Sequence, residues 1–202
     1  MRKSSTYKIL AAVMALSAVN VFVPHNMLAY NITSDNTTIS PEEPIKENIY
    51  GNGYSFTITG GTIDGDVFGA GNDDENYSED ASGGNVTING NAEVKYAVYG
   101  GYSESGQAHH NIVNISGDNS RVTRVYGGYS EIGSAYHNTV NISGGSVANV
   151  HGGSSYSGTA HHNTVNISDG AVSGDVCGGY SEIGSAYHNT VNISGGIRNI
   201  TY

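Results

Sequence analysis

The chain repeats itself about every 26 residues over most of its length, and this period limits what it can fold into. Six similar segments begin at Phe56, Val86, Val113, Val140, Val165 and Val191, at spacings of 30, 27, 27, 25 and 26 residues. Residues 127–145 and 178–196 are identical over all 19 positions. A unit this short cannot bury its apolar face alone, so the copies must stack on one another.

Each repeat has the alternating pattern of a β-strand. In the copy at 139–143, Val140 and Ile142 share one face, while Thr139, Asn141 and Ser143 share the other. Such alternation has the two-residue period of a strand. Apolar residues are not spaced by three and four after the first 29 residues, so no helix is expected there. Each repeat therefore predicts a strand, a glycine turn, a short strand, a double glycine and a polar bend.

This pattern predicts an all-β fold, a right-handed parallel β-helix (β-solenoid) of five to six rungs with about 26 residues per rung. The handedness follows the usual crossover preference. Strands about 4.8 Å apart place equivalent residues over one another. The inward columns should be Val113, Val140, Val165 and Val191; Ile115, Ile142, Ile167 and Ile193; and Asn111, Asn138, Asn163 and Asn189. Buried Asn side chains can hydrogen-bond from rung to rung, and the paired glycines are expected to adopt positive φ at tight corners.

The remaining regions divide into a leader and a short connecting segment. Residues 1–29 have a basic start and an apolar stretch of signal-peptide type, too short for a membrane span of about 20 residues. Residues 30–50 contain Pro41 and Pro44 and are interpreted as a polar linker or an N-terminal cap, before solenoid repeats over 51–202. Without the leader, 5 basic and 18 acidic residues remain, a net charge of −13 with histidine neutral. Such a surface repels phosphate backbones, so no nucleic-acid partner is expected.

The Gly-rich VNISGG strands and YGG doublets over 51–202 resemble the passenger domains of autotransporters and related bacterial adhesins. The resemblance implies a secreted or cell-surface protein of a Gram-negative-type bacterium. It also implies attachment to the outer membrane through a C-terminal β-barrel, which this sequence lacks. The repeats stop at Tyr202, just before the next double glycine, so we expect the solenoid to be truncated at its C-terminus.

The expected function is structural or adhesive and non-catalytic, toward a host or sister-cell surface protein or glycan. Two alternatives stay open. One is a glycan-binding module that uses a strip of tyrosines, and the other is a fragment of a polysaccharide-acting β-helix enzyme. Glu104, Glu131 and Glu182 recur at one position of the repeat, so their environments are alike, whereas a hydrolase needs two carboxylates in different environments. We therefore expect no enzyme.

The tyrosine strip is the candidate ligand-contact surface, because exposed aromatic side chains stack on sugar rings or pack against partner proteins. Its members are Tyr99, Tyr102, Tyr126, Tyr129 and Tyr180. The same recurrence also suits ladder packing within the solenoid, which is the simpler interpretation. Cys177 is the single cysteine, so no internal disulfide is expected.

Neither a cofactor nor a metal is expected, although two groups of residues are of types that can bind metal ions. The acidic insert holds five carboxylates that calcium accepts as ligands: Asp73, Asp74, Glu75, Glu79 and Asp80. The insert occurs once in the chain, and a solvated loop explains it. His110, His137, His162 and His188 recur in the rungs, with His109 and His161 beside two of them. Imidazoles bind zinc or copper, but stacking already explains their recurrence.

Overall fold

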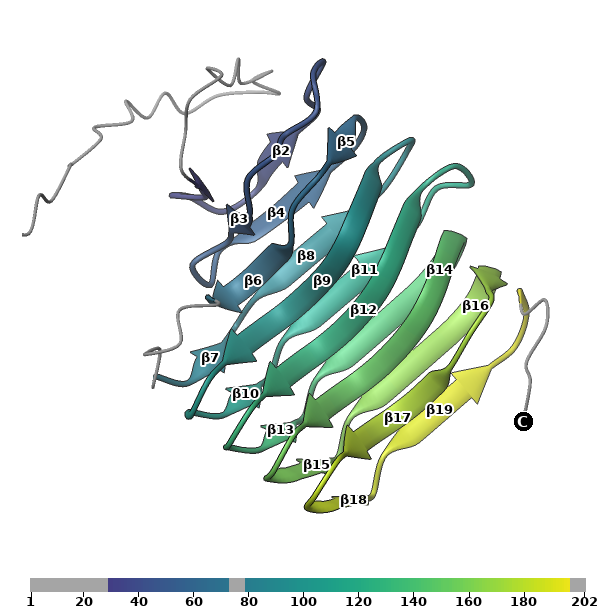
Figure 1. The fold of residues 1–202 in the computed structure, drawn as a ribbon. Helices are drawn as coiled ribbons and strands as arrows, with labels where there is room; N and C mark the ends of the chain where they lie inside the picture. Colours follow the sequence, from purple (N-terminus) through teal and green to yellow (C-terminus); the bar gives the residue numbers. More distant parts are fainter. Residues whose placement is uncertain (1–28, 73–78, 197–202) are drawn as a thin grey trace, which may run out of the picture.

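The computed structural model describes residues 29–72 and 79–196, and every secondary-structure element in these ranges is a β-strand (Figure 1). The strands pair in parallel and wind into a β-solenoid of about five turns, with equivalent residues about 26 positions apart, as the repeat predicted. No helix in the described part of the chain is long and apolar enough to cross a membrane. The predicted leader, residues 1–29, lies outside the described residues except for Ala29.

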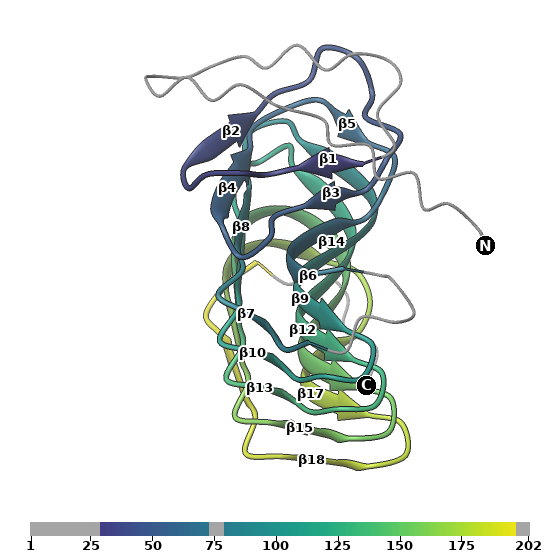
Figure 2. The same ribbon diagram turned by 90° about the vertical axis from the view of Figure 1, so that its left-hand side faces the viewer.

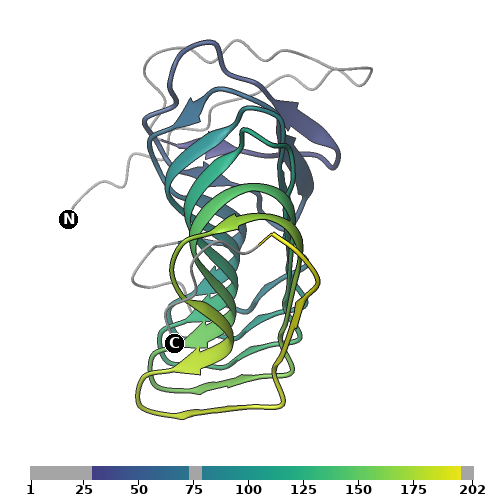
Figure 3. The same ribbon diagram turned by 90° about the vertical axis from the view of Figure 1, so that its right-hand side faces the viewer.

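Each turn of the solenoid has three sides, which overlap from rung to rung in Figures 2 and 3. The first side carries the VNIS-type strands β2 (Thr37–Ile39), β4 (Ser55–Ile58), β8 (Asn85–Ile88), β11 (Ile112–Ile115), β16 (Thr164–Val172) and β19 (Thr190–Ile193). The second carries β1 (Tyr30–Asn31), β3 (Ile49–Tyr50), β5 (Thr62–Ile63), β6 (Val67–Gly71), β9 (Glu93–Ser103), β12 (Arg121–Ser130) and β17 (Val176–Ser181). The third is a narrow sheet of β7 (Ala81–Ser82), β10 (Ala108–His109), β13 (Ala135–Tyr136), β15 (Thr159–His161) and β18 (Ser185–Tyr187). Strand β14 (Thr139–Ser155) pairs on both of the first two sides.

The core lies inside the coil and consists of the predicted columns. Val113 pairs with Val140, and Val140 with Val165, while the isoleucines two residues on pair in the same register. All of these side chains are at most 1% exposed. The last described rung has no rung beyond it among the described residues, so Val191 and Ile193 are 39% and 47% exposed.

A ladder of asparagines runs through the interior, as predicted. Asn111, Asn138 and Asn163 are fully buried. The Nδ2 of Asn138 donates to the Oδ1 of Asn163 at 3.0 Å and to the carbonyl of Ala108 at 2.9 Å. The Oδ1 of Asn138 accepts from both the backbone N–H and the Nδ2 of Asn111. Each amide therefore joins three successive rungs, and its polar atoms are satisfied by protein.

The expectation that the YGG doublets turn corners at positive φ is wrong. Gly127 and Gly128 lie within β12, and neither is among the positive-φ residues of the described chain. A Cβ on Gly127 would lie 2.2 Å from the carbonyl oxygen of Gly152 in the next rung, and one on Gly128 would lie 2.4 Å from the Nδ2 of Asn138. The doublet is therefore needed for close approach to the interior amide. The turn glycines after VNIS, such as Gly145 at φ 76°, do use the left-handed region.

Residues 30–50, interpreted as a linker or cap, contribute three short strands to the same sheet. Tyr30 pairs with Ile49, and Ile49 pairs with Val67 of the following rung. Their buried isoleucines join the core cluster: Ile32, Ile39, Ile45 and Ile49. Ile39 and Ile58 are only 19 positions apart, so this first coil is shorter than the later ones. It covers the apolar end of the first full rung.

The interior ladder should carry much of the stability. We expect Asn138→Ala to lower the free energy of unfolding by at least about 3 kcal/mol, because it leaves several buried polar groups unpaired at about 1–3 kcal/mol each. The matched control is Asn141→Ala, three residues away, whose half-buried Nδ2 donates to Asn114 in an outer amide ladder. Solvent can replace that bond, so its loss should cost less than about 1 kcal/mol. Urea unfolding measures both, and equal costs would contradict this assignment.

Candidate functional site

The tyrosine strip divides into two columns that pack against each other on the outside of β9 and β12. Tyr99 stacks on Tyr126 with ring centroids 5.1 Å apart and planes 7° apart, and Tyr102 stacks on Tyr129 at 5.2 Å and 15°. The columns meet edge to face, as between Tyr99 and Tyr102 at 83°. The fifth member, Tyr180, is 43% exposed and does not continue the column, because Ser154 occupies the rung between it and Tyr129.

The first column is longer than the strip. We call it the outer aromatic column, and its members are Tyr50, Phe68, Tyr99, Tyr126 and His151, stacked at 5.1–5.3 Å. Phe68 is only 1% exposed because its ring lies between those of Tyr50 and Tyr99, with the edge of Tyr102 beside it. Aligning VFGAG with VYGGYS predicts that Phe68 belongs to this column. The place of Tyr50 could not be predicted, because residues 30–50 do not show the repeat and only the structure reveals that they form a coil.

This packing determines what the columns offer to a ligand. A sugar stacks on the face of an aromatic ring, but the faces of Tyr99 and Tyr126 are covered by their neighbours in the column. The hydroxyl of Tyr129 donates to the carboxylate of Glu131 at 2.8 Å, and Tyr180 makes the same contact with Glu182. Burial, and then the bond to Glu131, raises the pKa of Tyr129. The first column therefore presents ring edges, and the second presents hydroxyls that are bound to carboxylates.

The glutamates do not form a pair of carboxylates with different roles. Glu104, Glu131 and Glu182 each lie two residues after a tyrosine that donates to them. The tyrosine partner repeats from rung to rung, while Glu104 and Glu131 are half-buried and Glu182 is exposed. An acid and a base in distinct environments are not provided by this column.

His151 is the part of the outer aromatic column that differs in chemistry. Its ring stacks on Tyr126, and its Nδ1 is the single buried side-chain nitrogen or oxygen of the described residues without a hydrogen-bond partner. Burial lowers the pKa of His151, opposed in part by Asp175. Cys177 follows it in register. Burial, and then the nearby Asp175, raises the pKa of that thiol.

One histidine in each of four rungs lies at the bend between the third and first sides of the coil. These bend histidines are His110, His137, His162 and His188. The side chains of His110, His137 and His162 are exposed and stack with ring centroids 5.2 and 5.1 Å apart. All four bend histidines, including His188, have φ between 52° and 55°. In two rungs the preceding residue is also a histidine, and the Nδ1 atoms of His109 and His110 lie 2.8 Å apart. The described residues contain no group of three or more His, Cys, Asp or Glu side chains that could hold a metal ion.

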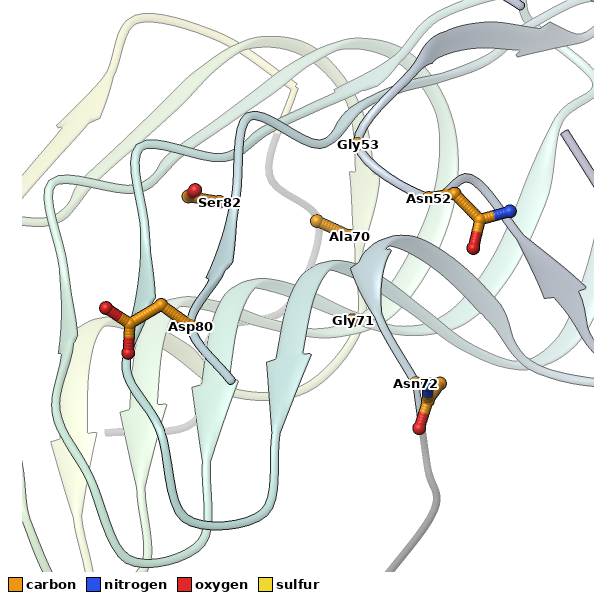
Figure 4. A pocket seen from close by; sticks show the side chains of 7 residues that line it. All are labelled: Asn52, Gly53, Ala70, Gly71, Asn72, Asp80 and Ser82. Carbon is orange, nitrogen blue, oxygen red and sulfur yellow. The ribbon is translucent and has the colours of Figure 1, made fainter. Parts of the chain in front are cut away.

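The acidic insert is described only in part, because Asp73, Asp74 and Glu75 lie outside the described residues. Glu79 and Asp80 are exposed. A hollow of about 230 Å³ beside them is lined by Asn52, Gly53, Ala70, Gly71, Asn72, Asp80 and Ser82 (Figure 4). The carboxylate of Asp80 and the amides of Asn52 and Asn72 point in different directions there, and they do not converge on one point.

The half-buried imidazole of His151, whose Nδ1 is fully buried, should make the stability depend on pH. Burial lowers its pKa in the folded protein, whereas the unfolded chain protonates it below about pH 6.5. Its contribution is therefore fully present above that pH and is lost as the pH falls. We expect His151→Tyr, which restores the residue of Tyr126, to stabilise the protein by about 1 kcal/mol at pH 8. The gain should be larger at pH 5.5.

Urea unfolding of the wild type and His151→Tyr at the two pH values measures this difference. The other histidines are the same in both proteins, so the change in the difference with pH isolates His151. A gain that is equal at both pH values would show that His151 is not held neutral by burial.

Comparison with protein-family models, curated proteins and solved structures finds no match for this chain. The fold is established by its own geometry as a parallel β-solenoid.

Proposed function

We propose that this chain is a non-catalytic structural stalk, the extracellular part of a secreted or surface protein of a Gram-negative-type bacterium. The observation that carries the proposal is that the recurring side chains hold neighbouring rungs together, both inside and outside the coil. Inside, the Asn111–Asn138–Asn163 amides bridge the rungs. Outside, the rings of Phe68, Tyr99 and Tyr126 do the same.

Such cohesion suits a spacer. Each rung contacts mainly the rungs before and after it, so length and stability grow with the number of copies. A rung adds about 4.8 Å to the axis. The alignment of side chains in both ladders opposes bending, because a bend would open the stacks on one side.

Export is the second element of the proposal, and it rests on the sequence. The leader over residues 1–29 is of signal-peptide type, and the remaining chain has 5 basic and 18 acidic residues. The resemblance to autotransporter passengers supports display outside the cell, with attachment through a β-barrel as in those proteins. An adhesive role would then be directed at a host or sister-cell surface.

The glycan-binding alternative has less support from the geometry. Stacking covers both ring faces of Tyr99 and Tyr126 and one ring face each of Tyr102 and Tyr129. The exposed ring of Tyr180 meets His151 edge to face. A glycan array probed with the full chain separates the two, since the stalk requires no sugar ligand. The enzyme alternative has the repeated tyrosine partner of the glutamates against it.

The identical segments allow a direct test of the stalk. Because residues 127–145 and 178–196 are the same, a copy of residues 146–196 can follow residue 196 without altering a junction. This adds two rungs. We expect the maximum dimension from small-angle scattering to increase by about 10 Å at constant cross-section, and the free energy of unfolding to rise.

The matched control is an insertion of equal length made of Gly and Ser at the same place. It should add a flexible loop and leave the stability unchanged or lower. If the duplicated repeats behaved like this control, the stalk proposal would be wrong. Binding to a defined sugar by the unmodified chain would favour the glycan-binding alternative.

A further inference from the structure

The bend histidines show an alternation that stacking alone does not require. At two rungs the bend carries two adjacent imidazoles, and their Nδ1 atoms lie 2.8 Å apart in His109–His110 and 2.9 Å apart in His161–His162. At the two other rungs Tyr136 and Tyr187 replace the first imidazole in the same register. The tyrosines stack as well as the histidines, with centroids 4.9–5.1 Å from the neighbouring imidazole. Stacking therefore does not explain why two rungs keep both nitrogens.

The paired nitrogens share a hydrogen bond at this separation. The same separation matches the bite of a divalent ion, which could replace the shared proton once both rings carry their own proton on Nε2. Two imidazoles bound at right angles to one ion, with bonds of about 2.0 Å, have nitrogens about 2.8 Å apart. Tetrahedral zinc would require about 3.3 Å. The bite thus favours the tetragonal geometry of Cu(II) or Ni(II).

The backbone does not require a histidine at the bend. In the preceding rung Gly83 holds the equivalent place, since Ser82 pairs with His109 and Asn85 with Ile112. Gly83 has φ 76°, in the left-handed region that glycine enters without strain. The four histidines adopt the same region at a conformational cost. A side chain retained there at all four bends points to a use for the imidazole at every rung, which contact between neighbouring rings supplies. The two paired rungs add a second imidazole to it.

The surroundings suit a bound cation at the first pair. The Nε2 of His109, on the far side of its ring from Nδ1, lies 3.7 Å from the carboxylate of Asp80. A carboxylate behind a ligating imidazole orients the ring and makes it more basic. The ring of His137 lies one rung away, 5.2 Å from that of His110. The side chain of His110 is exposed, so water can complete the coordination.

We propose that His109–His110 and His161–His162 are two separate bis-imidazole sites for a divalent transition-metal ion, with Cu(II) bound most tightly. Each ion is held by two Nδ1 atoms and by water. The intervening Tyr136 rung keeps the two ions two rungs apart, about 10 Å, which limits their repulsion. The order of affinity should be Cu(II), then Ni(II), then Zn(II).

Calorimetric titration of the untagged full chain with Cu(II), in a glycine buffer that competes for loose ions, tests the proposal. We expect two ions per chain, and nitrogen hyperfine splitting from two imidazoles in the electron paramagnetic resonance spectrum. His161→Tyr copies the residue already present at Tyr136 and Tyr187, so the fold should persist. It should lower the stoichiometry from two ions to one. Adding Tyr187→His to that variant creates a new pair one rung further on and should restore two ions.

His110→Gly is the second variant, and Gly83 shows that the bend accepts glycine. It should also bind one ion instead of two, with an unchanged circular dichroism spectrum. Two ions retained by either His161→Tyr or His110→Gly would overturn the proposal, because the copper would then sit at other ligands. A single ion in the His161→Tyr, Tyr187→His double variant would overturn it as well.

Discussion

The structure depends on one constraint, the in-register parallel stacking of rungs at strand spacing. Val113 lies over Val140, and Asn111 lies over Asn138. Each side chain in such a column therefore has a residue of its own type in the rung before it and in the rung after it. Residue types that interact with themselves are favoured under this constraint. Apolar side chains, amides and aromatic rings all do so, and they occupy the core columns, the interior ladder and the outer aromatic column. A position that lost its residue type in one rung would leave two neighbours without a partner.

The constraint explains what could be predicted from the sequence. The period and the two-residue alternation determine which residues face inward, so the Val, Ile and Asn columns were predicted correctly, including the buried ladder at Asn138. The YGG doublets were misjudged for a physical reason. The need for Gly128 comes from the side chain of Asn138, which follows it by ten residues and crosses the interior to meet it. Local sequence suggests a turn at such a doublet and contains no sign of that approach.

Other features were beyond the sequence because they depend on three-dimensional placement. Residues 30–50 have lost the repeat pattern, yet Ile39 and Ile49 occupy core positions, so the short first coil could not be recognised from periodicity. The left-handed φ of His110 follows from the bend geometry, and the aligned Gly83 was the one clue in the sequence. For the tyrosine strip, the spacing predicted the stacking of Tyr99 on Tyr126. The interruption of the second tyrosine column at Ser154 and the covering of the ring faces could be seen only in the structure.

A residue type that recurs in every rung of a solenoid therefore indicates first that it holds the rungs together. A rung in which the residue type differs is more informative about binding. The uniform columns support the proposed stalk. The alternation of paired histidines with a tyrosine and a histidine supports the proposed metal sites, because both alternatives stack equally well. Function on such a scaffold is best sought where a rung differs from its neighbours without a packing reason.

Native-state hydrogen exchange of the asparagine side chains tests the central claim most directly. If the interior ladder joins the rungs, the side-chain amides of Asn111 and Asn138 should exchange only through global unfolding, with a dependence on denaturant equal to that of the core amides of Val113 and Val140. The outer amides of Asn114 and Asn141 should exchange far faster, by local fluctuation. Rapid exchange of Asn138 at a rate like that of Asn141 would contradict the account.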